Sequence, residues 1–132
     1  MKIRKVNHEL YVNYLKKATE FYEAAKTEFE KQNWNSCVLN AIHCAISSTD
    51  ALTVFFNGVR HAGDKHFDSI NLLQELNLDK NLIKDKTRHL FALLDVKNMT
   101  EYEEKLTTED GAILALKHAD RFFGWVKEVT KK

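Results

Sequence analysis

The sequence has almost no residues that interrupt a helix. It contains no proline and only four glycines among 132 residues, and these two residue types are the least compatible with a helix interior. No stretch alternates convincingly between apolar and polar residues, which is the pattern of a half-buried β-strand. We therefore expect an all-α protein with no β-sheet.

Apolar residues instead recur at steps of three and four, the spacing that puts them on one face of a helix. We expect Asn7 to cap the first helix, and Thr107, with Asp110 three residues later, to cap the last. Long amphipathic helices with short connections predict an antiparallel up-and-down four-helix bundle with an additional short helix. No linker or repeat divides the chain, so we expect one domain over residues 1–132. The expected helices span approximately residues 8–31, 34–57, 67–76, 81–97 and 109–129.

The second of these helices is unusual in its charge. Between Asn33 and Val59 the only formally charged residue is Asp50. Surface helices carry Lys and Glu on their outer face, so we expect this helix to be the most buried element. Burial of an unpaired carboxylate is costly, and the cations that we consider as partners of Asp50 are Arg60 and Lys97.

A polar but nearly uncharged row also follows this helix. Interface cores are depleted in charged residues, so the row fits a protein–protein contact, for which we expect a symmetric homodimer with Asn40, His43 and Ser47 at the interface. The alternative is a hydrogen-bond network within one chain. A second possible contact surface is the Leu114–Trp125 side of the last helix, although Trp125 could equally cover a neighbouring helix. The full polar row is Ser36, Asn40, His43, Ser47, Asp50 and Asn57.

Arginine and histidines gather around Gly63 in the loop after this helix. Arginine grips phosphate with parallel hydrogen bonds, and histidine transfers protons near neutral pH. Arg60 and His66 could therefore cleave RNA without a metal, with His66 assisting the 2′-hydroxyl or protonating the leaving oxygen. The alternative is a structural role, in which Arg60 pairs with an acid near the end of the helix and Asp64 or His66 helps to start the next helix. In either case we expect His61 to border a cleft with Asp50.

The segment from Lys97 to Lys105 holds a second pair of residues suited to a phosphate. Lys97 supplies a cation and Tyr102 a phenol, and the two could face a phosphate together. Alternatively, Tyr102 packs on the end of the bundle and Lys97 is solvated.

The composition limits which cellular compartment and which classes of ligand we expect for the protein. Lys and Arg number 20 and Asp and Glu 19, so the net charge of +1 gives no global attraction to nucleic acid or to a membrane. No apolar run reaches the roughly 20 residues of a membrane span, and MKIRKVNHEL lacks the apolar core of a signal peptide. Cys37 and Cys44 lie too far apart on a helix for a disulfide. We expect a cytoplasmic protein with no membrane contact, no metal and no cofactor.

Several stretches in order resemble the HEPN domains, which are small helical bundles. They are NHELYVNYLKKATEFYEAAKTEFEKQNW, VLNAIHCAISSTDAL, KHFDSINLLQEL, KNMTEYE and TTEDGAILALKHADRFFGWV. The resemblance implies a dimer. It also implies either an RNase of the toxin–antitoxin or antiviral type or a companion of a small nucleotidyltransferase. RHAGDKH, from Arg60 to His66, matches the arginine-to-histidine spacing of the RNases, whose motif lies nearer the last helix. Lys97 and Tyr102 resemble the signature of HEPN proteins without an established nuclease role.

Three functions follow from these patterns. The first is a HEPN-like module, without catalysis of its own, that dimerises and binds a nucleotide, RNA or a partner protein, such as one of nucleotidyltransferase type. The second is a metal-independent endoribonuclease that uses Arg60 and His66. The third is a structural or adaptor bundle. The sequence leaves open whether the protein is an enzyme.

Overall fold

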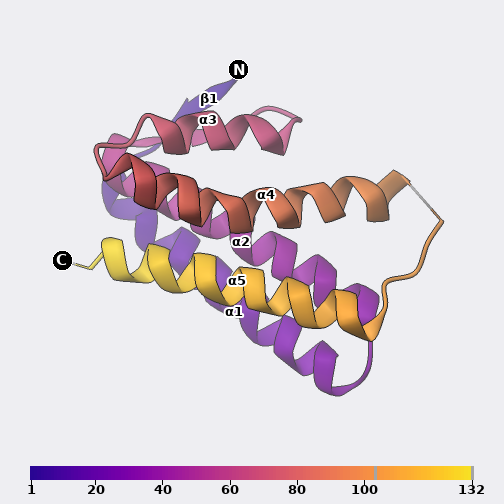
Figure 1. The fold of residues 1–132 in the computed structure, drawn as a ribbon. Helices are drawn as coiled ribbons and strands as arrows, with labels where there is room; N and C mark the ends of the chain where they lie inside the picture. Colours follow the sequence, from indigo (N-terminus) through magenta and orange to yellow (C-terminus); the bar gives the residue numbers. More distant parts are fainter. Residues whose placement is uncertain (103, 132) are drawn as a thin grey trace.

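The computed structural model describes the backbone of residues 1–102 and 104–131 and the side chains of residues 1–97 and 104–131. The expected all-α bundle is confirmed, with four long α-helices and one short one (Figure 1). The α-helices are α1 (Tyr11–Glu30), α2 (Trp34–Asn57), α3 (Ser69–Gln74), α4 (Lys80–Tyr102) and α5 (Glu109–Val129). Two short strands, β1 (Ile3–Lys5) and β2 (Val59–His61), and two 3-10 turns, η1 (His8–Leu10) and η2 (His66–Asp68), complete the described elements.

Helix α2 forms the centre of the core, as its low charge predicts. Its bounds match the expected ones, and more than half of its residues are buried, among them Ile42, Leu52 and Val54. By length and composition α2 is the one helix in the described part of the chain that could cross a membrane, but most of that stretch is buried inside the bundle. Both cysteines lie buried in α2 and form no disulfide.

The other long helices pack around α2, with α1 and α4 antiparallel to it and α5 parallel to it (Figure 1). Helix α1 reverses into α2 through a three-residue link, and α4 and α5 run side by side in opposite directions (Figure 1). Helices α1, α4 and α5 all contact α2, whereas α3 packs mainly on α4. The largest fully buried side chain is Phe122 of α5, in the same core as Leu90 of α4. This arrangement leaves the N-terminal segment to cover what the long helices do not.

The expectation that the chain has no sheet was wrong. Strands β1 and β2 pair antiparallel, with Arg4 opposite Arg60, and the pairing is extended by Val6 N–H donating to the carbonyl of Gly58 (2.9 Å). Gly58 ends α2 with a left-handed φ of +64°, a conformation that costs glycine little. A strand of three residues is too short to show an alternating pattern, which is why the sequence did not reveal it.

The structure differs from the expected helices in two N-terminal caps and in the division of one helix. Asn7 accepts a hydrogen bond from Glu9 N–H, but it caps η1, and α1 follows directly. The expected cap Thr107 was wrong by one residue, because Thr108 accepts the hydrogen bond from Gly111 N–H (3.1 Å). The region expected as one helix over residues 67–76 is divided into η2 and the shorter α3.

Candidate functional site

A cleft of about 520 Å³ lies between the N-terminal segment, α1 and α2, and we call it the outer cleft. Four cationic side chains line it, whereas Asp50 is its only acidic lining residue. Three of the cations are solvent-exposed, and Arg60 is half-buried. Such an excess of positive charge around a concave surface favours an anionic ligand. The cations are Arg4, Lys5, Lys17 and Arg60.

Backbone pairing and helix periodicity together explain how these cations meet. The β1–β2 pairing sets Arg4 directly opposite Arg60 and places Lys5 one residue further along β1. Lys17 reaches the same cleft from α1, where its ammonium group lies 5.5 Å from the ring centre of Tyr14, which also lines the cleft. Residues more than 40 positions apart in the sequence therefore contribute to one positively charged surface.

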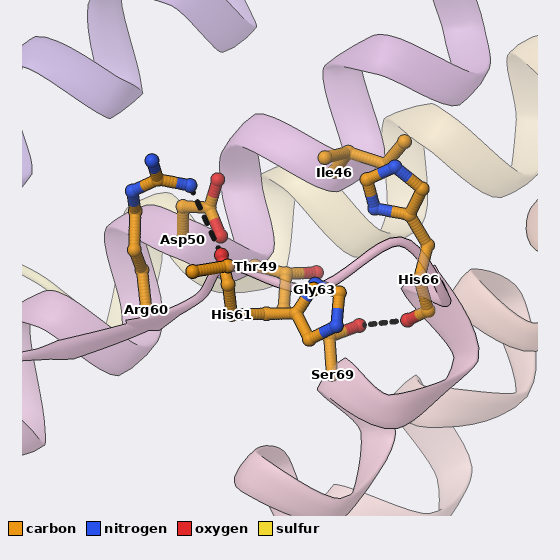
Figure 2. Close-up of a pocket in the computed structure, with 9 residues that line it drawn as sticks. Ile46, Thr49, Asp50, Arg60, His61, Gly63, His66 and Ser69 are labelled. Atoms are coloured by element: carbon orange, nitrogen blue, oxygen red, sulfur yellow. Dashed lines mark hydrogen bonds between the residues drawn. The ribbon is translucent and has the colours of Figure 1, made fainter. Parts of the chain in front are cut away.

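A smaller pocket of about 170 Å³ adjoins the outer cleft, and we call it the inner pocket (Figure 2). Asp50 and Arg60 line both spaces and so form their common wall. The rest of the inner pocket is formed by uncharged α2 residues and by the segment that runs from His61, the last residue of β2, through His66 in η2 to Ser69. The pocket is therefore much less positively charged than the outer cleft.

The carboxyl group of Asp50 is the most perturbed acid in this region. Burial raises its pKa to about 7, and the nearby charges of Arg60 and Lys17 oppose that rise. Of the two partners considered from the sequence, Arg60 thus acts on Asp50, while Lys17 takes the place expected for Lys97. A carboxyl group with a pKa near 7 exchanges its proton at physiological pH, so the charge of the common wall depends on conditions.

Arg60 and His66 line the same inner pocket but stand at its opposite ends. Figure 2 shows Asp50 and Thr49 between them, with the guanidinium group of Arg60 beside Asp50 and the ring of His66 beside Ile46. Arg60 Nη1 donates a hydrogen bond to the backbone carbonyl of His61 (3.0 Å). The two side chains therefore do not converge on one point in this conformation.

The loop between them is held by its own contacts. Ser69 Oγ donates to the carbonyl of His66 (2.6 Å), and the rings of His61 and His66 lie 5.7 Å apart. His61 is only 5% exposed, and its Nε2 has no hydrogen-bond partner among the described residues. Gly63 allows this packing, because a Cβ at Gly63 would lie 3.3 Å from that nitrogen.

The polar row of α2 is covered more fully than its composition suggested. Ser47 is 8% exposed and lines the outer cleft beneath the N-terminal segment. His43 is half-buried, with its ring 5.4 Å from that of Phe21 on α1, and Asn40 donates hydrogen bonds to Ser36 one turn earlier. The cover comes from α1 and the N-terminal segment, neither of which was expected in this role.

The remaining predicted residues lie elsewhere. Lys97 is half-buried in the C-terminal part of α4 and lines neither the outer cleft nor the inner pocket. The side chain of Tyr102 falls outside the described residues. Trp125 is 7% exposed and packs near Phe122, so it covers the core, whereas Leu114 is exposed.

Three cations of the outer cleft were missed from the sequence. Arg4 and Lys5 belong to a strand too short to be recognised, and Lys17 looks like any residue on the solvated face of an amphipathic helix. The only available signal was the concentration of positive charge in MKIRKV at the start of the chain.

Comparison with known proteins identifies the family. The model of the HEPN domain family matches residues 11–129. No curated protein and no solved structure gives a significant match. The matched region runs from the first residue of α1 to the last residue of α5, which agrees with the helical arrangement. The resemblance noted in the sequence is therefore confirmed, and the chain belongs to the HEPN domain family.

Proposed function

We propose that this protein is a cytoplasmic, homodimeric HEPN module that binds a phosphate-bearing ligand, either a nucleotide or RNA, without catalysis of its own. HEPN domains are helical modules often associated with nucleotides or RNA. The observation that carries the proposal is the outer cleft, where four cations from three elements surround a single acid. Arginine and lysine bind phosphate groups through charge-assisted hydrogen bonds to the phosphate oxygens.

The orientation of Arg60 supports binding over catalysis. A catalytic arginine and histidine must reach the same phosphate, whereas Arg60 faces Asp50 and His66 lies at the other end of the inner pocket (Figure 2). In the outer cleft, by contrast, Arg60 is one of several cations that can contact a phosphate together. Lys17 and Arg60 are the two whose charges also act on Asp50.

The binding proposal is tested by fluorescence anisotropy with a labelled single-stranded RNA bearing a 5′-phosphate, and by competition with mononucleotides. We expect Lys17→Glu and Arg60→Gln each to weaken binding about tenfold or more at low salt, and wild-type affinity to fall as salt rises. Lys16→Glu is the matched control, because Lys16 is exposed on the same helix, pairs with Glu20 (3.2 Å) and lies outside the cleft.

The outcomes separate the possible functions. Equal binding by wild type, Lys17→Glu and Arg60→Gln would place the ligand outside the outer cleft. If the wild type bound neither RNA nor mononucleotides at millimolar concentration, the structural or adaptor function would replace the binding one. A partner of nucleotidyltransferase type would then be sought by co-purification.

The alternative function is a metal-independent endoribonuclease, which the shared lining of the inner pocket by Arg60 and His66 favours. It requires RNA cleavage that persists in EDTA and disappears in His66→Ala while the helical circular dichroism spectrum is retained. Cleavage that survives in purified His66→Ala would exclude His66 from the mechanism, and no cleavage by the wild type would exclude this function.

A further inference from the structure

The inner pocket differs from the outer cleft in both charge and size. Asp50 and Arg60 form the wall that the two spaces share, and no other Asp, Glu, Lys or Arg lines the inner pocket. Its volume of about 170 Å³ is close to that of a protein cavity of about 150 Å³ that holds one benzene molecule. The inner pocket therefore has room for a single aromatic ring, whereas the fused rings of a purine exceed it.

Two hydroxyl groups of the inner pocket already use their protons within the protein. Thr49 Oγ1 donates to the carbonyl of Ala45 (2.9 Å), and Ser69 Oγ donates to the carbonyl of His66 (2.6 Å; Figure 2). Each hydroxyl oxygen can still accept a hydrogen bond, and the carboxyl group of Asp50 offers an acceptor oxygen in either protonation state. These walls therefore suit a ligand that donates hydrogen bonds from more than one N–H.

His61 adds a ring nitrogen that lacks a partner. The residue is 5% exposed, and its Nε2 is buried without a hydrogen bond to any described residue. Gly63, which also lines the pocket, leaves the space beside this nitrogen free of a side chain. A buried polar atom without a partner destabilises a protein, so a ligand that supplies the partner gains affinity. The orphaned nitrogen thus supports a ligand in the inner pocket independently of its size.

We propose that the inner pocket binds the base of a cytosine nucleotide whose phosphate lies in the outer cleft. The inference rests on the proposed function, because the outer cleft must hold the phosphate. Cytosine carries an amino group with two N–H donors where thymine and uracil carry an acceptor oxygen. The acceptors of Asp50, Thr49 and Ser69 suit that amino group. The cytosine carbonyl oxygen provides a partner for His61 in the tautomer that carries its proton on Nε2.

The order of the two spaces matches the parts of a nucleotide. The base and the phosphate are attached to different positions of the sugar, and Asp50 and Arg60 stand between the inner pocket and the outer cleft. Ile46, which is half-buried, gives the ring an apolar contact inside the pocket (Figure 2). The cations of the outer cleft hold the charged end of the same molecule.

Isothermal titration of the full-length protein at low salt tests the base specificity. We expect cytidine 5′-monophosphate to bind about tenfold or more tightly than adenosine 5′-monophosphate or ribose 5-phosphate, and about threefold or more tightly than uridine 5′-monophosphate. Equal binding of ribose 5-phosphate and cytidine 5′-monophosphate would overturn the inference but keep the phosphate site of the outer cleft. Binding of none of the four at millimolar concentration would refute nucleotide binding as the proposed function, and the inference with it.

Gly63→Ala tests the inner pocket without a change of charge. Its Cβ would lie 3.3 Å from Nε2 of His61 and occupy part of the pocket, and the φ of Gly63 is not positive, so alanine is compatible with the backbone. We expect the affinity for cytidine 5′-monophosphate to fall to that for ribose 5-phosphate, which stays unchanged. Gly124→Ala is the matched control and should alter neither affinity. Undiminished cytidine 5′-monophosphate binding in Gly63→Ala would contradict the inference.

Methyl NMR of the wild type locates the base without any variant. Saturating cytidine 5′-monophosphate should shift the methyl resonances of Ile46 through the ring current of the base, and ribose 5-phosphate should not. The methyl groups of Ile113, which is 46% exposed on α5, serve as the internal control. If the Ile46 resonances stayed in place at saturation, the base would lie outside the inner pocket and the inference would be wrong.

Discussion

At the scale of single residues, Asp50 links the stability of the protein to its candidate site. It is the only charged residue of α2 and forms the common wall of the outer cleft and the inner pocket. The other residues of α2 carry no formal charge, and more than half of the helix is buried. A carboxyl group in this helix therefore carries a desolvation cost. Keeping such a residue in the core helix is easier to explain by a role in the site than by a contribution to folding.

We predict that Asp50→Asn makes the protein more stable at pH 8. The pKa of Asp50 rises from 3.8 to about 7 on folding, so the folded state holds the proton more tightly. This contribution to stability is complete below pH 3.8 and is lost as the pH rises through 7. Because Asp50 is partly exposed, we expect a gain of roughly 1–3 kcal/mol at pH 8 and little change near pH 4.

Urea denaturation of wild type and variant between pH 4 and 8 measures this difference. Asp64→Asn is the control, because Asp64 is exposed in the nearby loop and should leave the pH profile unchanged. Parallel wild-type and Asp50→Asn profiles across this range would show that Asp50 titrates normally in the folded protein.

Some residues of the candidate site could be predicted from the sequence. Asp50 stood out because its helix has no other charge, and Arg60, His61 and His66 stood out because they crowd around Gly63. The structure brings these four together around the inner pocket. Lys17 gave no such signal, because its role depends on which helix faces which, and that information is absent from a local pattern.

At the scale of elements, the junction of α2 and β2 lies beside the strand pairing that lines part of the outer cleft. Gly58 turns the chain out of α2, and its carbonyl accepts the hydrogen bond from Val6 N–H that extends the strand pairing. The same pairing positions Arg4 and Lys5 beside Arg60. A tight left-handed turn thus directly precedes the strand that brings Arg60 to the charged surface.

We predict that Gly58→Ala destabilises the protein by about 1–2 kcal/mol. The φ of +64° is unfavourable for a residue with a Cβ, and that Cβ would also lie 3.3 Å from the Val6 carbonyl oxygen. Thermal or urea unfolding measures the loss. Gly124→Ala is the matched control, because a Cβ there meets nothing within 4 Å and alanine favours the helix. Equal stability of Gly58→Ala and wild type would mean that the turn relaxes without cost.

At the scale of the whole molecule, the bundle was predictable because its long helices have strong periodicity and few interruptions. The bounds of α2 and α5 matched those expected, and the burial of α2 followed from its missing charges. The β1–β2 pairing was not predictable, since two three-residue segments 54 or more positions apart give no periodic signal. Assembly is a further property that helix periodicity alone does not determine.

The last prediction is that the protein is a symmetric homodimer that uses the exposed edge of the polar row of α2. HEPN domains commonly dimerise. Ser47 is covered by the N-terminal segment, but Asn40 and His43 are half-buried and lie beside the exposed Leu39, so this part of α2 combines apolar and uncharged polar surface. A two-fold axis would let the edge meet its own copy.

Light scattering after size exclusion should give about twice the chain mass of 15.4 kDa at tens of micromolar. Asn40→Arg should yield monomers, because it puts a charge at the interface, whereas Leu114→Arg on α5 should remain dimeric. The reverse result would move the interface to α5, and a monomeric wild type would refute the dimer.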